Sequence, residues 1–173
     1  PDFATQVATS IQEVILNGDN VNINNSTIGL MDYYEDYSAS MYADITEGSA
    51  YTINVTLQDL STFNTYLGGA RVFIDYNIDG DFLDAGEDIG IVPSPSTPGL
   101  PVPITFTVPN TGAYGATRMR VVCQDQFNIT SSNDIGPCDA PLSGTNGIPW
   151  FGATEDYSIV LNAPTIIASF LWE

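Results

Sequence analysis

Apolar and polar residues alternate along several segments of the chain, and this period of two is typical of half-buried β-strands. Tyr51, Ile53 and Val55 share one face of such a segment, and threonine and asparagine fill the positions between them. The segments with this alternation are 51–57, 104–108, 118–123 and 156–161. Further segments rich in strand-forming residues are 11–16, 21–30, 70–76 and 88–92. No segment keeps the helical period of about 3.6 residues without a breaker, so the pattern predicts an all-β chain.

Turn-forming residues separate these predicted strands. Gly, Pro, Asn, Asp and Ser concentrate in the connectors 17–20, 93–103, 110–115 and 131–149. Short strands joined by such turns favour an antiparallel β-sandwich, and we expect a jelly-roll-like one with about eight strands or more. The predicted sandwich covers residues 1–162 as one domain, and residues 163–173 form an exit segment or an edge strand that leads to a following module.

The composition supports a packed core. Hydrophobic residues make up 43% of the 173 residues, which distinguishes the chain from a disordered acidic tail. No apolar run approaches the roughly 18 residues of a membrane-spanning helix, so we expect no membrane insertion. The chain begins at Pro1 without an initiator methionine or a visible secretory signal, and we interpret it as a piece of a longer processed protein.

The charge balance is strongly acidic. The chain has 21 acidic residues, three arginines, no lysine and no histidine, and its formal net charge is −18. This charge repels phosphate backbones and anionic lipids, so nucleic acids and acidic membranes are unfavourable partners. An acidic surface without lysine suits a salty extracellular setting, where dissolved ions screen the repulsion. We therefore expect a secreted or cell-surface protein.

The missing residue types exclude several kinds of catalytic site. Without histidine there is no Ser-His-Asp triad and no histidine-ligated zinc, and without lysine there is no Schiff base or P-loop lysine. A glycosidase needs only two carboxylates at a suitable separation, but among 21 acidic residues no particular pair stands out. We therefore predict that the domain is not an enzyme.

Cys123 and Cys138 are the two cysteines of the chain. In an extracellular protein, a bridge between them would close a loop of about 15 residues and contribute on the order of 3 kcal/mol to stability. We expect this disulfide, and two buried free thiols are the alternative. No CxxC pair is present, so we do not expect a zinc ribbon or a thiol redox site.

An acidic segment at residues 75–87 carries the sharpest chemical pattern in the chain. Asp75, Asn77 and Asp79 stand at alternate positions, and Gly80 follows them. Short oxygen-bearing side chains at alternate positions converge on one ion when the chain curls around it, and the glycine permits the sharp turn. Flexible all-oxygen ligation favours Ca²⁺ over Mg²⁺, whereas the alternative is a solvated acidic turn without metal. The candidate calcium ligands are Asp75, Asn77, Asp79, Asp81 and Glu87.

The acidic segment differs from a helical calcium hand in two ways. Gly86 stands where that motif has its bidentate glutamate, and Glu87 comes one residue later. The segment also follows a predicted strand at 70–76 instead of a helix. We therefore expect a calcium loop carried by a strand.

Three motifs occur in order along the chain and resemble those of the GEVED family. The sequence VFIDYNIDGDF at 72–82 leads to AGE at 85–87, and FTVP at 106–109 is followed by GATRMRV at 115–121. GATEDY at 152–157 stands in the place of the family's Gly-Glu-Val-Glu-Asp-Tyr motif. The resemblance runs from about residue 28 to residue 161, with two early strands at Tyr37-Ser38 and Tyr51-Thr52-Ile53.

The sequence departs from the family pattern at two places. Ala153 and Thr154 replace the usual Glu-Val pair, and Tyr76 replaces the usual tryptophan. If the missing glutamate helps to bind an ion in relatives, this chain lacks that contribution. The resemblance implies a non-catalytic β-sandwich module of a large secreted protein, of the kind found in Bacteroidota and marine bacteria beside adhesins, metalloproteases and polysaccharide-degrading enzymes.

Aromatic side chains in loops are candidates for contacts with sugar, because apolar sugar faces stack on aromatic rings. For each of these side chains, the alternative to sugar binding is packing in the core or at a sheet edge. The candidates are Tyr33, Tyr34, Tyr37, Tyr66, Phe127, Trp150 and Phe151. Arg118 and Arg120 share one face of a predicted strand, where we expect them to pair with Asp156 or Glu155.

These features together predict a calcium-binding accessory module that carries no catalytic residues. We expect it to bind a polysaccharide or a cell-surface glycan, or to act in adhesion, beside neighbouring domains of the same chain. The alternative is a structural spacer that calcium stabilises. With only three arginines in the chain, strongly anionic polysaccharides are less favoured ligands unless calcium bridges them.

Overall fold

The computed structural model describes residues 9–30, 33–61, 65, 67–126, 129–138 and 152–165. These residues form ten β-strands and the short 3₁₀ helix η2 (Ser132–Asp134). The strands are β1 (Thr9–Asn17), β2 (Asn22–Ser26), β3 (Tyr34–Asp36), β4 (Tyr42–Thr46), β5 (Ala50–Asp59), β6 (Gly68–Ile74), β7 (Asp88–Val92), β8 (Pro101–Thr107), β9 (Gly115–Asp125) and β10 (Gly152–Asn162). Within this described part, no helix has the length and apolar character needed to cross a membrane.

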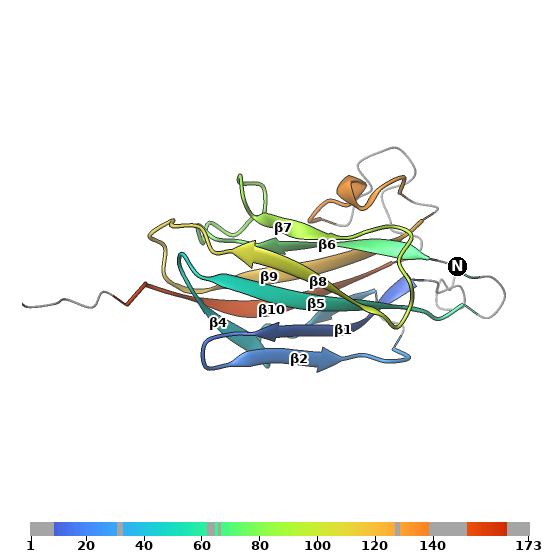
Figure 1. Cartoon of the computed structure of the whole chain (residues 1–173), viewed down its shortest axis with the longest axis horizontal. Helices are drawn as coiled ribbons and strands as arrows, with labels where there is room; N and C mark the ends of the chain where they lie inside the picture. The colour runs from blue at the N-terminus through green and yellow to red at the C-terminus, as the bar shows by residue number, and fades with distance from the viewer. Residues whose placement is uncertain are drawn as a thin grey trace, which may run out of the picture.

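The strands form two sheets that pack face to face. One sheet has four strands in the order β2-β1-β5-β8, and the other has the order β3-β10-β9-β6-β7 with β4 also paired to β10. Figure 1 shows the two sheets lying one over the other, with their strands running in roughly the same direction. The predicted β-sandwich is therefore confirmed. Among the described pairings, β3 and β4 run parallel to β10 and the others are antiparallel.

The main hydrophobic core lies between the sheets. Ile53 and Val55 of β5 belong to the same buried cluster as Val121 of β9 and Ile159 of β10. Strand alternation explains this arrangement, because every second side chain of β5, β9 and β10 points inward. The predicted faces of these three segments are therefore the faces that the structure buries.

A second, smaller apolar cluster lies on the outer face of the six-stranded sheet. Phe73 of β6 and Val122 of β9 are buried there with Ile129 and Ile135, and Phe82 of the acidic segment packs against them. The register pairs Val72 with Val121, which point inward, and pairs the neighbouring residues Arg71 and Val122, which therefore point outward. The outer face is thus partly covered by two connecting segments instead of being open to solvent.

Arg71 fastens one of these covering segments to the sheet. Its Nη1 donates hydrogen bonds to the carbonyl oxygens of Asn133 at 2.8 Å and Ile135 at 2.9 Å. Its Nη2 pairs with Asp88 of β7 at 2.6 Å. One arginine therefore holds the segment around η2 against both β6 and β7.

The predicted disulfide between Cys123 and Cys138 is absent, and this prediction is wrong for the structure. Cys123 is buried on the inner face of β9, where its sulfur accepts a hydrogen bond from the Ala153 N–H at 3.2 Å. Cys138 is exposed beside Pro137, whose carbonyl accepts a hydrogen bond from Arg120 on the outer face. The six-stranded sheet stands between the two sulfurs, so they cannot pair.

Candidate metal loop and outer-face hollow

The acidic loop joins β6 to β7 and is organised by the carboxylate of Asp75. Its two oxygens accept hydrogen bonds from the backbone N–H groups of Ile78 at 2.7 Å, Asp79 at 3.3 Å and Gly80 at 3.1 Å. Ile78 and Gly80 have positive φ values of 62° and 94°, which curl the chain around Asp75. Asp75 is only 4% exposed, so its oxygens serve mainly to shape the loop.

Glu87 closes the other end of the loop in the same manner. Its Oε1 accepts a hydrogen bond from the N–H of Tyr76 at 3.1 Å, and its Oε2 accepts one from Asp84 at 3.2 Å. The side chain is 2% exposed, and this burial raises its pKa, with the nearby charge of Asp75 acting in the same direction. Two buried carboxylates therefore hold the two ends of the loop together.

Three exposed carboxylates converge at the tip of the loop. Asp79, Asp81 and Asp84 each present an oxygen within 4.8 Å of the others. The amide nitrogen of Asn77 donates to Asp79 at 2.8 Å and to Asp84 at 2.7 Å, which draws these two side chains together. A backbone hydrogen bond from Asp81 and the Asn77 amide lower the pKa of Asp79, so its carboxylate is charged at neutral pH.

The tip of the loop offers oxygen ligands of the kind that a hard divalent cation binds. Ca²⁺ takes six to eight oxygen ligands, and Asp79, Asp81 and Asp84 supply three charged ones while solvent can complete the shell. The predicted ligands Asp79 and Asp81 lie in this cluster, and Asp84 joins them. Asp75 and Glu87 lie beneath it, where their carboxylates accept hydrogen bonds from backbone N–H groups. The residues present could therefore hold a metal ion.

Sequence reasoning missed Asp84. The alternation of acidic residues continues from Asp79 through Asp81, but Leu83 interrupts the even spacing and Asp84 falls out of phase. The Glu87 carboxylate, by accepting the N–H of Asp84, turns this residue back toward the tip. The sequence feature that could have identified Asp84 is thus its spacing from Glu87, Asp84-x-x-Glu87. This spacing is typical of a capping interaction and not of a metal-binding motif.

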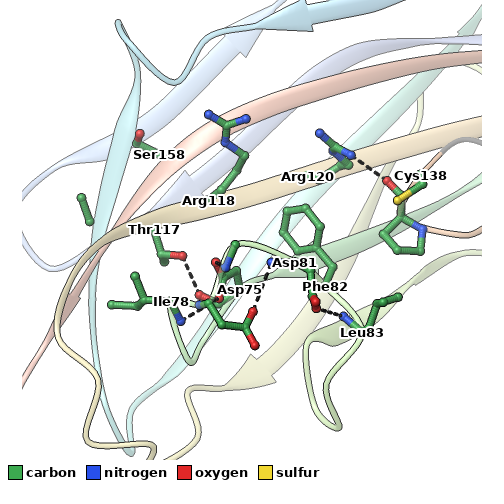
Figure 2. A pocket seen from close by; sticks show the side chains of 14 residues that line it. Asp75, Ile78, Asp81, Phe82, Leu83, Thr117, Arg118, Arg120, Cys138 and Ser158 are labelled. Atoms are coloured by element: carbon green, nitrogen blue, oxygen red, sulfur yellow. Dashed lines mark hydrogen bonds between the residues drawn. The ribbon is translucent and has the colours of Figure 1, made fainter.

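A hollow of about 550 Å³ lies between this loop and the outer face of β9 and β10. Phe82 projects from the loop toward the arginines of β9, and the guanidinium of Arg120 lies 5.3 Å from the centre of its ring. Figure 2 shows Ser158 and Arg118 at one end of the hollow and Cys138 at the other. The hollow is thus bordered by acidic, aromatic and basic side chains together.

Asp156 organises the side of the sheet next to this hollow. It is fully buried and accepts two hydrogen bonds of 2.7 Å from Arg120, which form a bidentate pair. Arg118 contacts the same carboxylate at 3.3 Å, and the hydroxyl of Tyr34 donates to it at 2.9 Å. The predicted pairing of both arginines with an acidic residue of β10 is confirmed, and the partner is Asp156.

Glu155 points to the opposite face of β10, into the core. The hydroxyl of Tyr157 donates a hydrogen bond to it, and Thr27 donates another at 3.3 Å. Burial raises the pKa of Glu155 to about 7, and the charge of nearby Glu35 acts in the same direction. Adjacent acidic residues of one motif therefore serve different faces of the sheet, because side chains alternate along a strand.

The predicted sugar-contacting aromatics fall into three groups. Tyr66, Phe127, Trp150 and Phe151 lie outside the described residues. Tyr37 is half-buried and stacks on Tyr157 with ring centres 5.6 Å apart, so it packs against the core. Tyr33 and Tyr34 are exposed, and Tyr34 lies on the outer face beside Asp156.

Comparison with known protein families bears on the part of the chain that holds the loop, the hollow and Asp156. A family model described as the GEVED domain matches residues 69–160. This range is more than half of the 173 residues and extends from β6 into β10. A search of curated proteins found no match.

Proposed function

Because the chain belongs to the GEVED domain family, a family of accessory modules, we propose that it is a calcium-stabilised module that targets polysaccharide. We further propose that it is exported to the extracellular space or the cell surface as residues 1–162 of a larger protein. The observation that supports calcium binding is the convergence of the Asp79, Asp81 and Asp84 carboxylates. Three like charges within 4.8 Å repel one another, and a bound cation removes that repulsion.

Calcium in this role stabilises the loop without taking part in a reaction. A ligand that binds only the folded state adds about 3 kcal/mol when it is present at roughly 100 times its Kd. The loop carries Phe82, which packs on the outer-face cluster, so its order determines one wall of the hollow. Calcium would therefore preserve the shape of a binding surface.

Thermal unfolding tests the calcium part of the proposal. We expect the Tm of the protein to rise when CaCl₂ replaces EDTA, and Asp84→Asn to remove most of that rise. Glu13→Gln is the matched control, because it also removes one negative charge but lies on β1 of the other sheet. An unchanged Tm in EDTA and in calcium would contradict the proposal.

Retention on polysaccharides tests the targeting part. We expect the calcium-loaded protein to bind reproducibly to at least one member of a panel of insoluble and gel-embedded polysaccharides. The proposal is supported by an exposed tyrosine next to a hollow that also offers carboxylate and guanidinium groups. A protein that calcium stabilises but that no polysaccharide retains would be a structural spacer instead.

A further inference from the structure

The outer face of the six-stranded sheet carries a row of side chains next to the hollow. The register pairs Thr154 of β10 with Tyr34, and Ser158 with both Tyr42 and Arg118. Residues paired in this way point to the same side of a sheet. We call this surface the β10 face, and it consists of Tyr34, Asp36, Tyr42, Arg118 and Ser158.

Tyr34 is an exposed ring that is already held in place. It is 51% exposed, although its hydroxyl is bonded to the buried carboxylate of Asp156 at 2.9 Å. A ring tethered at its far end loses little conformational freedom when a ligand stacks on it. Tyr34 is therefore suited to stacking against a flat apolar surface.

Tyr42 provides a second exposed ring on the same face. It is 43% exposed, and its partner Ser158 lies four residues beyond Thr154, the partner of Tyr34. Four residues correspond to roughly 13 Å along a strand. The two rings thus start from separate backbone positions along the sheet edge, an arrangement that suits an extended chain better than one small molecule.

Polar groups lie beside the two rings. The side chain of Arg118 is 44% exposed and makes one ion-pair contact of 3.3 Å with Asp156, whose carboxylate already binds Arg120 twice at 2.7 Å. Asp36 is exposed, and hydrogen bonds from Ser38 together with the nearby charge of Arg118 lower its pKa, so it is an acceptor at neutral pH. A guanidinium and a carboxylate suit the donor and acceptor character of hydroxyl groups.

The charges of the protein favour an uncharged ligand. The chain carries a net charge of −18, and Asp36, Asp79 and Asp81 all lie on or near this face. Arg71 and Arg120 are largely buried, with 19% and 18% of their side chains exposed, and they are bound to Asp88 and Asp156. One half-exposed guanidinium cannot offset the repulsion between this surface and a polyanion.

We propose that the β10 face binds an uncharged, hydroxyl-rich polysaccharide chain, stacked on Tyr34 and Tyr42 and hydrogen-bonded to Arg118 and Asp36. This inference rests on the polysaccharide targeting proposed above and assigns it a surface and a ligand class. The bound chain would run along β10 toward the hollow, which begins at Arg118 and Ser158 (Figure 2). Calcium at the loop would fix the far wall of that hollow.

Affinity gel electrophoresis in calcium tests this assignment. The uncharged probes are hydroxyethyl cellulose, xyloglucan and galactomannan, and the charged probes are polygalacturonate and carrageenan. We expect retardation by at least one uncharged probe, with binding about tenfold weaker in Tyr34→Ala and in Tyr42→Ala because each loses one stacked ring. Arg118→Gln should weaken binding in the same direction.

Tyr114→Ala is the matched control for the two tyrosine variants. Tyr114 is 49% exposed, and its hydroxyl donates to the buried carboxylate of Glu47 at 2.9 Å, as that of Tyr34 does to Asp156. Its replacement should leave binding unchanged. Tyr42 is 43% exposed and its replacement removes little packing, so Tyr42→Ala tests the face even if Tyr34→Ala reduces stability.

The possible outcomes separate this inference from the broader proposal. Binding of an uncharged probe that both tyrosine variants weaken, and that Tyr114→Ala does not, supports the β10 face. Binding that Trp150→Ala abolishes while Tyr34→Ala and Tyr42→Ala leave it intact overturns the inference but retains polysaccharide targeting. Binding of charged probes alone also overturns the inference. Failure of every probe overturns the inference and the polysaccharide targeting together.

Discussion

Asp156 is the side chain on which the outer face of the sheet depends. It is fully buried, and it is the shared acceptor for Arg120, Arg118 and Tyr34. Asp156→Asn removes the charge that two guanidinium groups require, and breaking a buried pair in this way costs about 3 kcal/mol or more. We therefore expect a fall of that size in the free energy of unfolding, measured by urea denaturation in calcium.

Asp36→Asn is the control for this prediction. Asp36 lies opposite Asp156 in the register of β3 and β10, but it is exposed, and an asparagine can still accept the hydrogen bond from the Ser38 N–H. Its replacement should change the free energy of unfolding by no more than about 0.5 kcal/mol. Equal effects of the two substitutions would show that Asp156 is not the organising residue.

Glu155 makes stability depend on pH. Burial raises its pKa to about 7 from an ordinary value of 4.5, so the folded state holds a proton that the unfolded state releases. The resulting stabilisation is complete below about pH 4.5 and is lost as pH rises through about 7. One pKa unit corresponds to about 1.4 kcal/mol, so the rise from 4.5 to about 7 corresponds to roughly 3 kcal/mol.

Glu155→Gln tests this linkage, because glutamine keeps the shape of the protonated acid but cannot ionise. Urea denaturation at several pH values between 5 and about 8 should show a clear fall for the wild type and a flatter profile for the variant. Burial also raises the pKa of Glu87, which contributes a slope of the same sign to both proteins. Parallel profiles for the two proteins would contradict the assignment of the proton to Glu155.

The residues of the acidic loop show how far side-chain roles follow from spacing. The alternation of Asp75, Asn77 and Asp79 predicts a curled loop, and the structure has one. The spacing did not show that Asp75 and Glu87 are buried and accept hydrogen bonds from backbone N–H groups, whereas the other acidic residues form the exposed cluster. Which carboxylates are buried depends on which backbone N–H groups face inward. The spacing missed Asp84 for the same reason.

At the scale of strands, predictability follows the length of the alternating pattern. β5, β9 and β10 have at least ten residues each, and their inward faces were predicted correctly. β3 has only three residues, and β4 buries three consecutive positions instead of alternating, so the alternation did not predict them as strands. Their parallel pairing with β10 joins segments more than one hundred residues apart, which local pattern cannot reveal.

The face of β9 on which Cys123 lies also explains why the predicted disulfide is absent. Cys123 shares the inward face of β9 with Val121, whereas Cys138 lies on the outer side near Arg120. We expect a thiol reagent such as DTNB to modify one cysteine in the folded protein and both in denaturant. Reductant should leave Tm unchanged. A Tm that falls on reduction, or a native protein without a reactive thiol, would show that the disulfide forms.

At the scale of the whole molecule, charge is distributed unevenly between the two sheets. All three arginines, Arg71, Arg118 and Arg120, lie on the outer face of the six-stranded sheet, and each one pairs with an aspartate. The chain has 21 acidic residues and only three basic side chains, so its acidic groups far outnumber the cations available to pair with them. The folded state therefore carries a repulsion that depends on the ions in solution.

Two kinds of cation effect should consequently be separable. Raising NaCl from about 0.01 M to about 1 M shortens the screening length from roughly 30 Å to roughly 3 Å, which weakens repulsion over the whole surface. We expect Tm to rise with NaCl in the wild type and in Asp84→Asn alike, because screening does not depend on one carboxylate. Calcium at the same ionic strength should add a further rise in the wild type, and Asp84→Asn should remove most of that further rise. If NaCl reproduces the whole effect of calcium, the acidic loop acts only as part of the general charge, and the ion is not a specific component of the module.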